Sequence, residues 1–392
     1  MTTLRLTSTL LLLALFSAAA EAAAPKRVLI VHSFSRDFAP YNAIGLALRT
    51  DLTRLLAQPA AFHEVSLDVE RGNAPEDERP FVDHVLRRSR GTPPDLVIAI
   101  AVPAALFCLR FRDELFPDRP LLVTGVDHRR VAGIKLGEKD RVVGVNLDFL
   151  GTARTILQLR PDTTRLALVI GTSQLEQFWT KAMQRELAPL GDRLRLLPLD
   201  GLSLAQARQR VAELPPDSAV LYYMFALGAD GALHENELAL AAIRESSSAP
   251  VYGMFTSQLG DGIVGGSLID TRRVGSVTAE LAVHMLDGER GAGGNVTVLA
   301  QAPAFDWREL QRWGIPESRL PPGAEVRFRP PSLWEQHKLL ITATAVIVLL
   351  QAALITALLV QHARRRRAEK ESLHLGGRLI TAHEDERKHL AR

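Results

Sequence analysis

Two long apolar runs divide the chain into a leader, a large middle part and a short tail. The first run lies between Leu6 and Ala20, behind a single charge at Arg5, and small residues continue to Ala24. A charged start, a short apolar run and a small-residue cleavage site are typical of a secretory signal peptide. We therefore predict that residues 1–24 are a signal peptide and that the middle of the chain is exported.

The second run predicts a transmembrane helix over residues 339–360. These 22 residues contain no charged side chain. At about 1.5 Å per residue they reach about 33 Å, enough to cross the core of a bilayer. Trp334 precedes the run and the arginines Arg364–Arg367 follow it. Because positive flanks stay on the cytoplasmic side, we predict that residues 362–392 are cytoplasmic and that residues 25–330 lie outside.

Between the two runs, short apolar segments alternate with segments of helical periodicity. Strands are expected first at residues 27–32, 62–69, 95–101 and 121–126, with helices at 41–56, 77–90 and 103–115. The alternation restarts at residue 149, with expected strands at 165–171, 194–199, 219–224, 251–254 and 262–264. This pattern predicts an α/β fold of two doubly wound parallel units. We place lobe 1 at about 25–148, lobe 2 at about 149–270 and a return segment at 271–330.

Composition and charge exclude several classes of protein. Cys108 is the single cysteine, so neither a disulfide framework nor a cysteine-based metal site can form within the chain. The whole chain has a formal net charge of +3. The tail carries nine basic and five acidic residues, a net charge of +4, so the rest of the chain has a net charge of about −1. The basic character therefore belongs to the membrane flank, and nucleic acid is not an expected partner. The exported part has no close histidine pair for a metal and no G-x-S-x-G nucleophile motif, so we expect a binder without a cofactor.

Ligands of open α/β sheets bind beyond the carboxyl ends of the strands. The polar and aromatic residues that follow the expected strands are therefore the candidate ligand-binding residues: Ser33, Phe34, Asp37, Asp127, Thr172, Ser173, Glu176, Trp179, Tyr223 and Gln258. Asp127 and Glu176 are suited to a ligand amine, and Phe34 or Trp179 to an apolar group.

Ser33, Thr172 and Ser173 offer hydroxyls or helix N-terminal amides to a carboxylate. The alternative for these three residues is that they only cap helices. The corresponding alternative for Asp127 is that it orders a turn.

Several long strings carry a resemblance to a known group of proteins. They are Val28–Asn42 (VLIVHSFSRDFAPYN), Arg112–Pro117 (RDELFP), Leu259–Gly266 (LGDGIVGG) and Asp306–Gly323 (DWRELQRWGIPESRLPPG). Together they resemble the exported sensor region of bacterial membrane histidine kinases. In that group the sensor is similar to the substrate-binding protein of an ABC transporter and has a type I periplasmic-binding-protein fold. The resemblance implies a periplasmic sensor that closes on a small molecule, in a single-pass protein of the bacterial inner membrane.

The tail carries a second resemblance. Residues 379–392 (LITAHEDERKHLAR) resemble the start of the dimerisation and phosphoacceptor helix of histidine kinases. The string ends before the position of the acceptor histidine, and neither His383 nor His389 occupies that position. The expectation is an N-terminal fragment of an ATP:protein-histidine phosphotransferase that lacks the catalytic domain. ATP and Mg²⁺ are then expected only for the missing kinase domain.

Two classes of function follow from these observations. The first is the sensor part of a two-component histidine kinase. Its expected partners are a small-molecule ligand, membrane lipid, a second copy bound through the membrane and cytoplasmic helices, and a cognate response regulator in the full-length protein. The alternative is a membrane-anchored substrate-binding component of an ABC-type transporter. The tail favours the sensor, because a transport component needs no dimerisation helix after its anchor.

Overall fold

The computed structural model describes residues 24–69, 78–89, 92–131, 135–288, 295–330 and 333–390. The chain forms two compact units, Met1–Arg329 and Pro330–Arg392. The expected signal peptide at residues 1–24 falls outside the described residues except for Ala24, so it stays a prediction.

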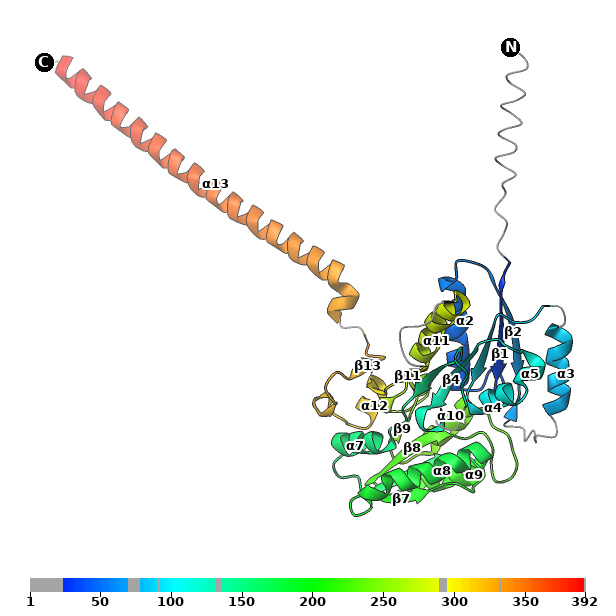
Figure 1. Ribbon diagram of the computed structural model, residues 1–392. Coiled ribbons are helices and arrows are strands. Elements are labelled where there is room, and N and C mark those ends of the chain that lie inside the picture. Colours follow the sequence, from blue (N-terminus) through cyan, green and yellow to red (C-terminus); the bar gives the residue numbers. More distant parts are fainter. Residues whose placement is uncertain are drawn as a thin grey trace, which may run out of the picture. The chain divides into compact units, whose positions relative to one another are not determined.

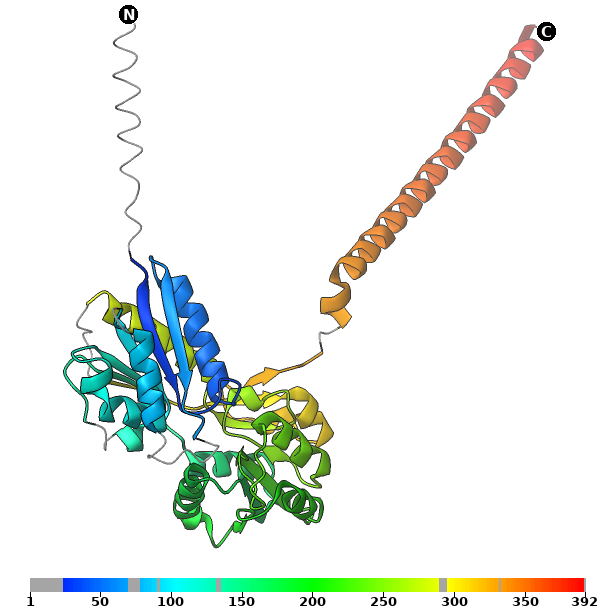
Figure 2. The ribbon, with the colours of Figure 1, turned by 90° about the vertical axis from the view of Figure 1, so that its right-hand side faces the viewer.

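The first unit contains two α/β lobes, seen in Figures 1 and 2 as a blue and cyan lobe above a green one. Lobe 1 is built on a parallel six-stranded sheet with the order β11-β5-β4-β3-β1-β2. Its strands are β1 (Lys26–His32), β2 (Ala60–Ser66), β3 (Leu96–Ile100), β4 (Leu121–Asp127), β5 (Arg141–Val145) and β11 (Val296–Leu299).

Helices cover both faces of this sheet, which explains why its central strands β3 and β4 are almost entirely apolar and buried. One face packs against α2 (Tyr41–Leu55) and α11 (Thr271–Leu286), which Figure 1 shows side by side. The other face packs against α3 (Glu78–Ser89), α4 (Val102–Arg110) and α5 (Arg112–Leu115). Alternate residues of β1 serve the two faces: Val28 and Ile30 belong to the α2 side, and Leu29 and Val31 to the α4 side.

Lobe 2 repeats the arrangement on a smaller parallel sheet with the order β7-β6-β8-β9. The strands are β6 (Arg165–Ile170), β7 (Arg195–Pro198), β8 (Ser218–Met224) and β9 (Val251–Tyr252). One face is covered by α7 (Phe149–Leu159) and α8 (Gln174–Leu187), and the other by α9 (Leu204–Ala212) and α10 (Asn236–Ser246). The expected α/β class with parallel sheets is confirmed.

The chain crosses between the lobes after β5, after β10 (Gly265–Leu268) and after β11. The return segment is therefore shared: α11 and β11 belong to lobe 1, whereas β12 (Ala302–Asp306) pairs antiparallel with β10 beside lobe 2. β12 is followed by α12 (Trp307–Arg312) and by β13 (Glu325–Arg327), which pairs parallel with β12. These three crossing segments connect the lobes, and connections of this kind commonly act as hinges.

Some expected elements differ from the structure at the local level. The helix expected at 103–115 is broken at Phe111, whose φ of −106° and ψ of 17° separate α4 from α5. The strand expected at 262–264 begins instead at Gly265, after a turn in which Gly260 and Gly262 adopt positive φ angles of 103° and 107°. β5 and β11 were not predicted, since their short apolar runs do not stand out without their neighbours in the sheet.

The second unit contains one helix, α13 (Leu333–Leu390), with a break at His337 (φ −122°, ψ 17°). Its segment His337–Arg367 is long and apolar enough to cross a membrane. The large apolar side chains between Leu339 and Val360 are all exposed on this helix. This segment contains the predicted run at 339–360 and is a candidate membrane span.

Candidate functional site: a cavity between the lobes

A cavity of about 310 Å³ lies between the end of β4 in lobe 1 and α8 in lobe 2. Lobe 1 contributes Asp127 and the short helix α6 (His128–Val131), and lobe 2 contributes one side of α8. The lining residues are Asp127, Arg129, Arg130, Phe178, Trp179, Ala182, Arg185 and Glu186. The volume lies at the lower end of the range for small-molecule sites. Its position at a strand end is the one that the sequence predicts.

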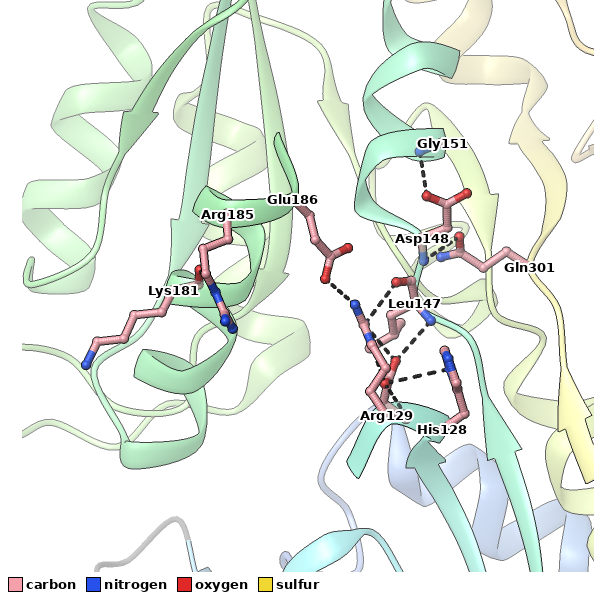
Figure 3. Close-up of polar contacts among 10 residues, drawn as sticks. His128, Arg129, Leu147, Asp148, Gly151, Lys181, Arg185, Glu186 and Gln301 are labelled. Atoms are coloured by element: carbon pink, nitrogen blue, oxygen red, sulfur yellow. Dashed lines mark hydrogen bonds and ion pairs between the residues drawn. The ribbon is translucent and has the colours of Figure 1, made fainter. Parts of the chain in front are cut away.

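An ion-pair network ties the two lobes together at this cavity (Figure 3). The Asp127 carboxylate accepts from Arg129 Nε at 2.7 Å and from Arg129 Nη2 at 2.8 Å. Across the cavity, Nη1 of Arg129 donates to Glu186 on α8. The hydrogen bond to Asp127 is the main reason that the pKa of Arg129 lies above its usual value. Burial raises the pKa of Glu186, and the charge of Arg129 opposes that effect.

The acceptor capacity of Asp127 is largely used within the protein. Its Oδ1 also accepts from the backbone N–H of Arg129 at 3.0 Å, and its Oδ2 from that of Leu147 at 3.1 Å. The carboxylate therefore orders the turn after β4, which is the local role considered for it above. Its expected contact with a ligand amine stays a prediction.

An aromatic cluster forms the lobe 2 side of the cavity. Trp179 is 4% exposed and packs against Phe149, Phe178 and Tyr223, with ring centroids 5.8, 5.1 and 5.7 Å away. The guanidinium of Arg129 lies 5.8 Å from the Trp179 ring. Two of the predicted residues, Asp127 and Trp179, thus line one cavity, and a third, Tyr223, packs against Trp179. Trp179 lines the cavity from a ring held in place on three sides.

The three predicted residues after β1, Ser33, Phe34 and Asp37, lie in different surroundings. Ser33 Oγ donates to the Ile100 carbonyl at 2.7 Å and accepts from the Ala104 N–H at 2.9 Å, so it supports the start of α4. Phe34 is buried and stacks on Tyr41 with a centroid distance of 4.9 Å.

Asp37 lies elsewhere, in a second cavity of about 580 Å³ between α2 of lobe 1 and Glu237 and Ser257 of lobe 2. In that cavity the pKa of Glu64 is lowered by its hydrogen bond from His32.

The predicted residues at the start of α8 are engaged in local structure. Ser173 and Glu176 form a reciprocal capping box, in which each side chain accepts from the backbone N–H of the other. Glu176 is fully buried and also accepts from the Ala226 N–H at 2.7 Å. Burial raises the pKa of its carboxyl. Thr172 Oγ1 donates to the Leu227 carbonyl at 3.1 Å.

Gln258 is likewise buried among backbone partners. Its Oε1 accepts from the N–H groups of Met254 and Phe255 at 2.9 and 3.1 Å, and its Nε2 donates to the Tyr223 carbonyl at 3.1 Å. It therefore holds the end of β8, and Tyr223 with it, in place. A ligand contact for Gln258 stays a prediction, as it does for Ser33, Thr172, Ser173 and Glu176.

Sequence reasoning missed six residues of the cavity: Arg129, Arg130, Phe178, Ala182, Arg185 and Glu186. Arg129 and Arg130 directly follow Asp127 and His128, so extending the strand-end rule by one helical turn would have found them. Phe178 is the neighbour of Trp179 on α8. Glu186 carries no local signal, because only the tertiary structure brings it opposite Arg129. Among the residues that the structure describes, no group of three or more histidine, cysteine or acidic side chains is placed to hold a metal ion.

Comparisons with known proteins support the fold. No protein-family model matches the chain, and no curated protein matches it. The solved structures that match include the ABC domain in complex with L-Trp from Streptococcus pneumonia, with 16% identity, a TM-score of 0.56 and coverage of 77% of this chain and 100% of the other. A substrate-binding protein from Clostridium difficile, in its ligand-free open form, has 14% identity, a TM-score of 0.54 and coverage of 77% and 98%. A conserved domain protein from Vibrio cholerae has 17% identity, a TM-score of 0.54 and coverage of 75% and 97%.

These similarities and the topology define the fold as an α/β fold with parallel sheets, like that of type I periplasmic binding proteins. At this level of identity the comparison concerns the fold alone.

Proposed function

We propose that residues 25–330 bind a small organic solute between the two lobes, as the sensor part of a two-component histidine kinase. The observation that carries solute binding is the cavity of about 310 Å³ whose walls come from both lobes. One protein of similar fold is described in complex with L-Trp, and another as a substrate-binding protein in an open, ligand-free form. A ligand that contacts both lobes favours the closed arrangement by its extra affinity for it.

A few polar contacts join the lobes directly. The free-energy difference between open and closed arrangements is therefore expected to be small. Arg129 reaches Glu186 on one side of the hinge. On the other side, Asn42 Nδ2 donates to Glu237 at 3.3 Å, and Asn236 Nδ2 donates to the Ala39 carbonyl at 3.2 Å. Exposed or partly exposed polar contacts contribute on the order of 1 kcal/mol each. A ligand that adds a few kcal/mol across the cavity is therefore sufficient to shift the population of closed molecules.

The long α13 supports a signalling role over a transport role. The helix runs through the apolar segment and past Arg364–Arg367 to Leu390 without a further break. A continuous helix transmits a movement outside the membrane to the cytoplasmic side, where the tail resembles a dimerisation helix. In this proposal the partners are a second copy, a response regulator, membrane lipid, and a kinase module that uses ATP and Mg²⁺. The alternative, a membrane-anchored component of an ABC-type transporter, is supported by the fold of the Clostridium difficile protein.

Solute binding is expected to raise the melting temperature of the purified full chain in detergent. A ligand at 100 times its dissociation constant stabilises the folded state by about 2.7 kcal/mol, which is a shift of several degrees for a domain of this size. Thermal shift across a broad metabolite library measures this directly. Phe178→Ala, which removes a 40% exposed ring of the cavity wall, should weaken a genuine hit. Leu238→Ala, an exposed side chain on α10, should leave the affinity unchanged.

The absence of any shift at millimolar concentrations of every compound would count against a solute-binding protein. Equal effects of the Phe178 and Leu238 variants would remove this cavity from the binding site.

A chimera separates the sensor from the transport component. The chain through Arg392 is joined to the acceptor helix and nucleotide-binding domain of a well-behaved histidine kinase, and expressed in bacterial spheroplasts. A compound from the thermal-shift screen, added outside, should change phosphorylation of the chimera several-fold, because the tail is cytoplasmic and carries the movement inward. A chimera that is phosphorylated but insensitive to the compound favours the transport component. If the fused kinase module could not be phosphorylated by cytoplasmic ATP, the tail would lie outside the cytoplasm, and the proposed orientation would be wrong.

A further inference from the structure

Arg130 is an arginine of the cavity without an anionic partner. It is half-buried in α6, and among the residues that the structure describes it makes no ion pair and no hydrogen bond through its side chain. Its neighbour Arg129 forms ion pairs with both nearby carboxylates, those of Asp127 and Glu186. The guanidinium of Arg130 lies instead 4.7 Å from the centroid of the Phe178 ring. A cation–π contact of this kind contributes about 0.5–2 kcal/mol, less than a paired carboxylate in a desolvated site.

The groups around Arg130 compensate its charge only in part, because the nearest carboxylate, that of Asp127, is bonded to Arg129. The electrostatic neighbours of Arg130 are Tyr41, Tyr223 and Asp127. Burial raises the pKa of Tyr41 to about 12 and that of Tyr223 well above its usual value, so both phenols are neutral. Burial also lowers the pKa of Arg130, which shows that its position disfavours an unpaired cation. A bound anion would supply the partner that this position lacks.

Two cavities meet at Arg130. It lines the cavity between the lobes, and it also lines a smaller one of about 200 Å³ at the strand ends of lobe 1. The apolar side chains of the smaller cavity are Leu67, Val69, Phe81, Val102, Pro103 and Leu106. A space of this size and lining suits one aromatic ring or a branched alkyl group.

The charges of the two cavities further restrict the ligand. Their acidic residues are Asp127, Glu186 and Glu78, and each is paired with an arginine: the first two with Arg129, and Glu78 with Arg110. Of the arginines that line the two cavities, Arg130 and the exposed Arg185 are not paired with these acidic residues. Among the residues that the structure describes, the site therefore offers a cation to a ligand but no free carboxylate for a ligand ammonium group.

We infer that Arg130 binds the carboxylate of the solute, and that the solute is a small aromatic or branched monocarboxylate without an ammonium group. This inference rests on the proposed binding between the lobes and specifies the class of ligand. The planar guanidinium donates two parallel hydrogen bonds to the carboxylate. The apolar part of the ligand packs against Phe178 and fills the apolar cavity of lobe 1.

The test uses three probes with the same carbon frame: 3-phenylpropionate, its neutral amide 3-phenylpropanamide, and the zwitterion L-phenylalanine. Binding is measured by isothermal titration on the full chain in lipid nanodiscs. We expect the acid to bind at least about 10-fold more tightly than the amide or the amino acid. Arg130→Gln should weaken the acid by about 10- to 100-fold and abolish the preference over the amide. Arg154→Gln, at an exposed position on α7, should change neither.

A second measurement distinguishes loss of recognition from loss of folding. Because Arg130→Gln removes a desolvated and unpaired cation, the variant without ligand should melt at or above the wild-type temperature. Arg130→Lys, which keeps the charge but loses the planar fork, should bind the acid with intermediate affinity.

Three results would overturn the inference: equal binding of the acid and the amide, unchanged affinity in Arg130→Gln, or a library in which only neutral or cationic compounds bind. In each case the proposed binding of a solute between the lobes would stand. A complete lack of binding by any compound would overturn both proposals.

Discussion

Replacing Arg112 by alanine should lower the free energy of unfolding of residues 25–330 by about 3–5 kcal/mol. The carboxylate of Asp140 is fully buried, and it accepts from Arg112 Nη1 at 2.6 Å and from Nη2 at 2.8 Å. Without Arg112, the buried charge keeps only the backbone N–H groups of Gly137 at 2.7 Å and Leu121 at 3.0 Å. Breaking one side of a buried pair is costly, because the remaining charge is desolvated and unpaired. Urea unfolding monitored by circular dichroism measures the loss.

The pH dependence of this effect has a defined sign. Burial by itself raises the pKa of Asp140, but the hydrogen bonds from Arg112 and the backbone outweigh burial and hold the pKa below its usual value. A carboxyl whose pKa is lower in the folded state stabilises the protein above its unfolded pKa, and the contribution is lost as the pH falls through the folded value. The difference between wild type and Arg112→Ala should therefore be largest near neutral pH and shrink in acid.

Arg327→Ala is the matched control for this prediction. Arg327 makes an equally regular two-point contact with Glu325, at 2.9 Å for both bonds, but the Glu325 side chain is 59% exposed. Exposed pairs contribute about 0–1 kcal/mol. Similar losses for the two arginine variants would show that burial of Asp140 is not the cause.

Gly275→Leu should disrupt the packing of α11 on α2, with Gly275→Ala as the smaller step. A Cβ atom at position 275 would lie 2.5 Å from the Ile44 carbonyl oxygen, 2.7 Å from Ala47 Cβ and 2.9 Å from the Leu48 nitrogen. Two of these three atoms belong to the backbone of α2 and cannot turn aside. Overpacking costs about 1–3 kcal/mol, whereas alanine gains only about 0.5–1 kcal/mol over glycine in a helix.

We therefore expect Gly275→Ala to lose about 1–2 kcal/mol of unfolding free energy and Gly275→Leu to lose more. Glu280→Leu places the same side chain on the exposed face of α11, where Glu280 pairs only with the exposed Arg273, and should change stability little. Urea unfolding of the three variants tests the order. A Gly275→Leu protein as stable as Glu280→Leu would show that the two helices can separate without cost.

The sequence predicted the fold class, and the edge of the sheet at which the cavity lies, with local information alone. Apolar strands buried on both faces, such as β1 and β3, are visible as short runs, and parallel sheets bind their ligands at the strand ends. Asp127 and Trp179 were selected by this rule and line the cavity between the lobes, and Tyr223 packs against Trp179. Ser173, Glu176 and Gln258 satisfy the same rule, but their polar atoms bond to the backbone. Sequence position cannot separate these two outcomes, because capping a helix and binding a ligand call for the same polar side chains.

The sequence by itself determined the candidate membrane segment, the alternation of strands and helices, and the strand ends at which polar residues gather. Each depends on length or periodicity over a few consecutive residues. Only the tertiary structure decided that β11 returns to pair with β5, and that Arg129 bonds to both Asp127 and Glu186 while Arg130 is left unpaired. Which charges are paired depends on distances between side chains far apart in the chain, and these exist only once the two lobes have folded against each other.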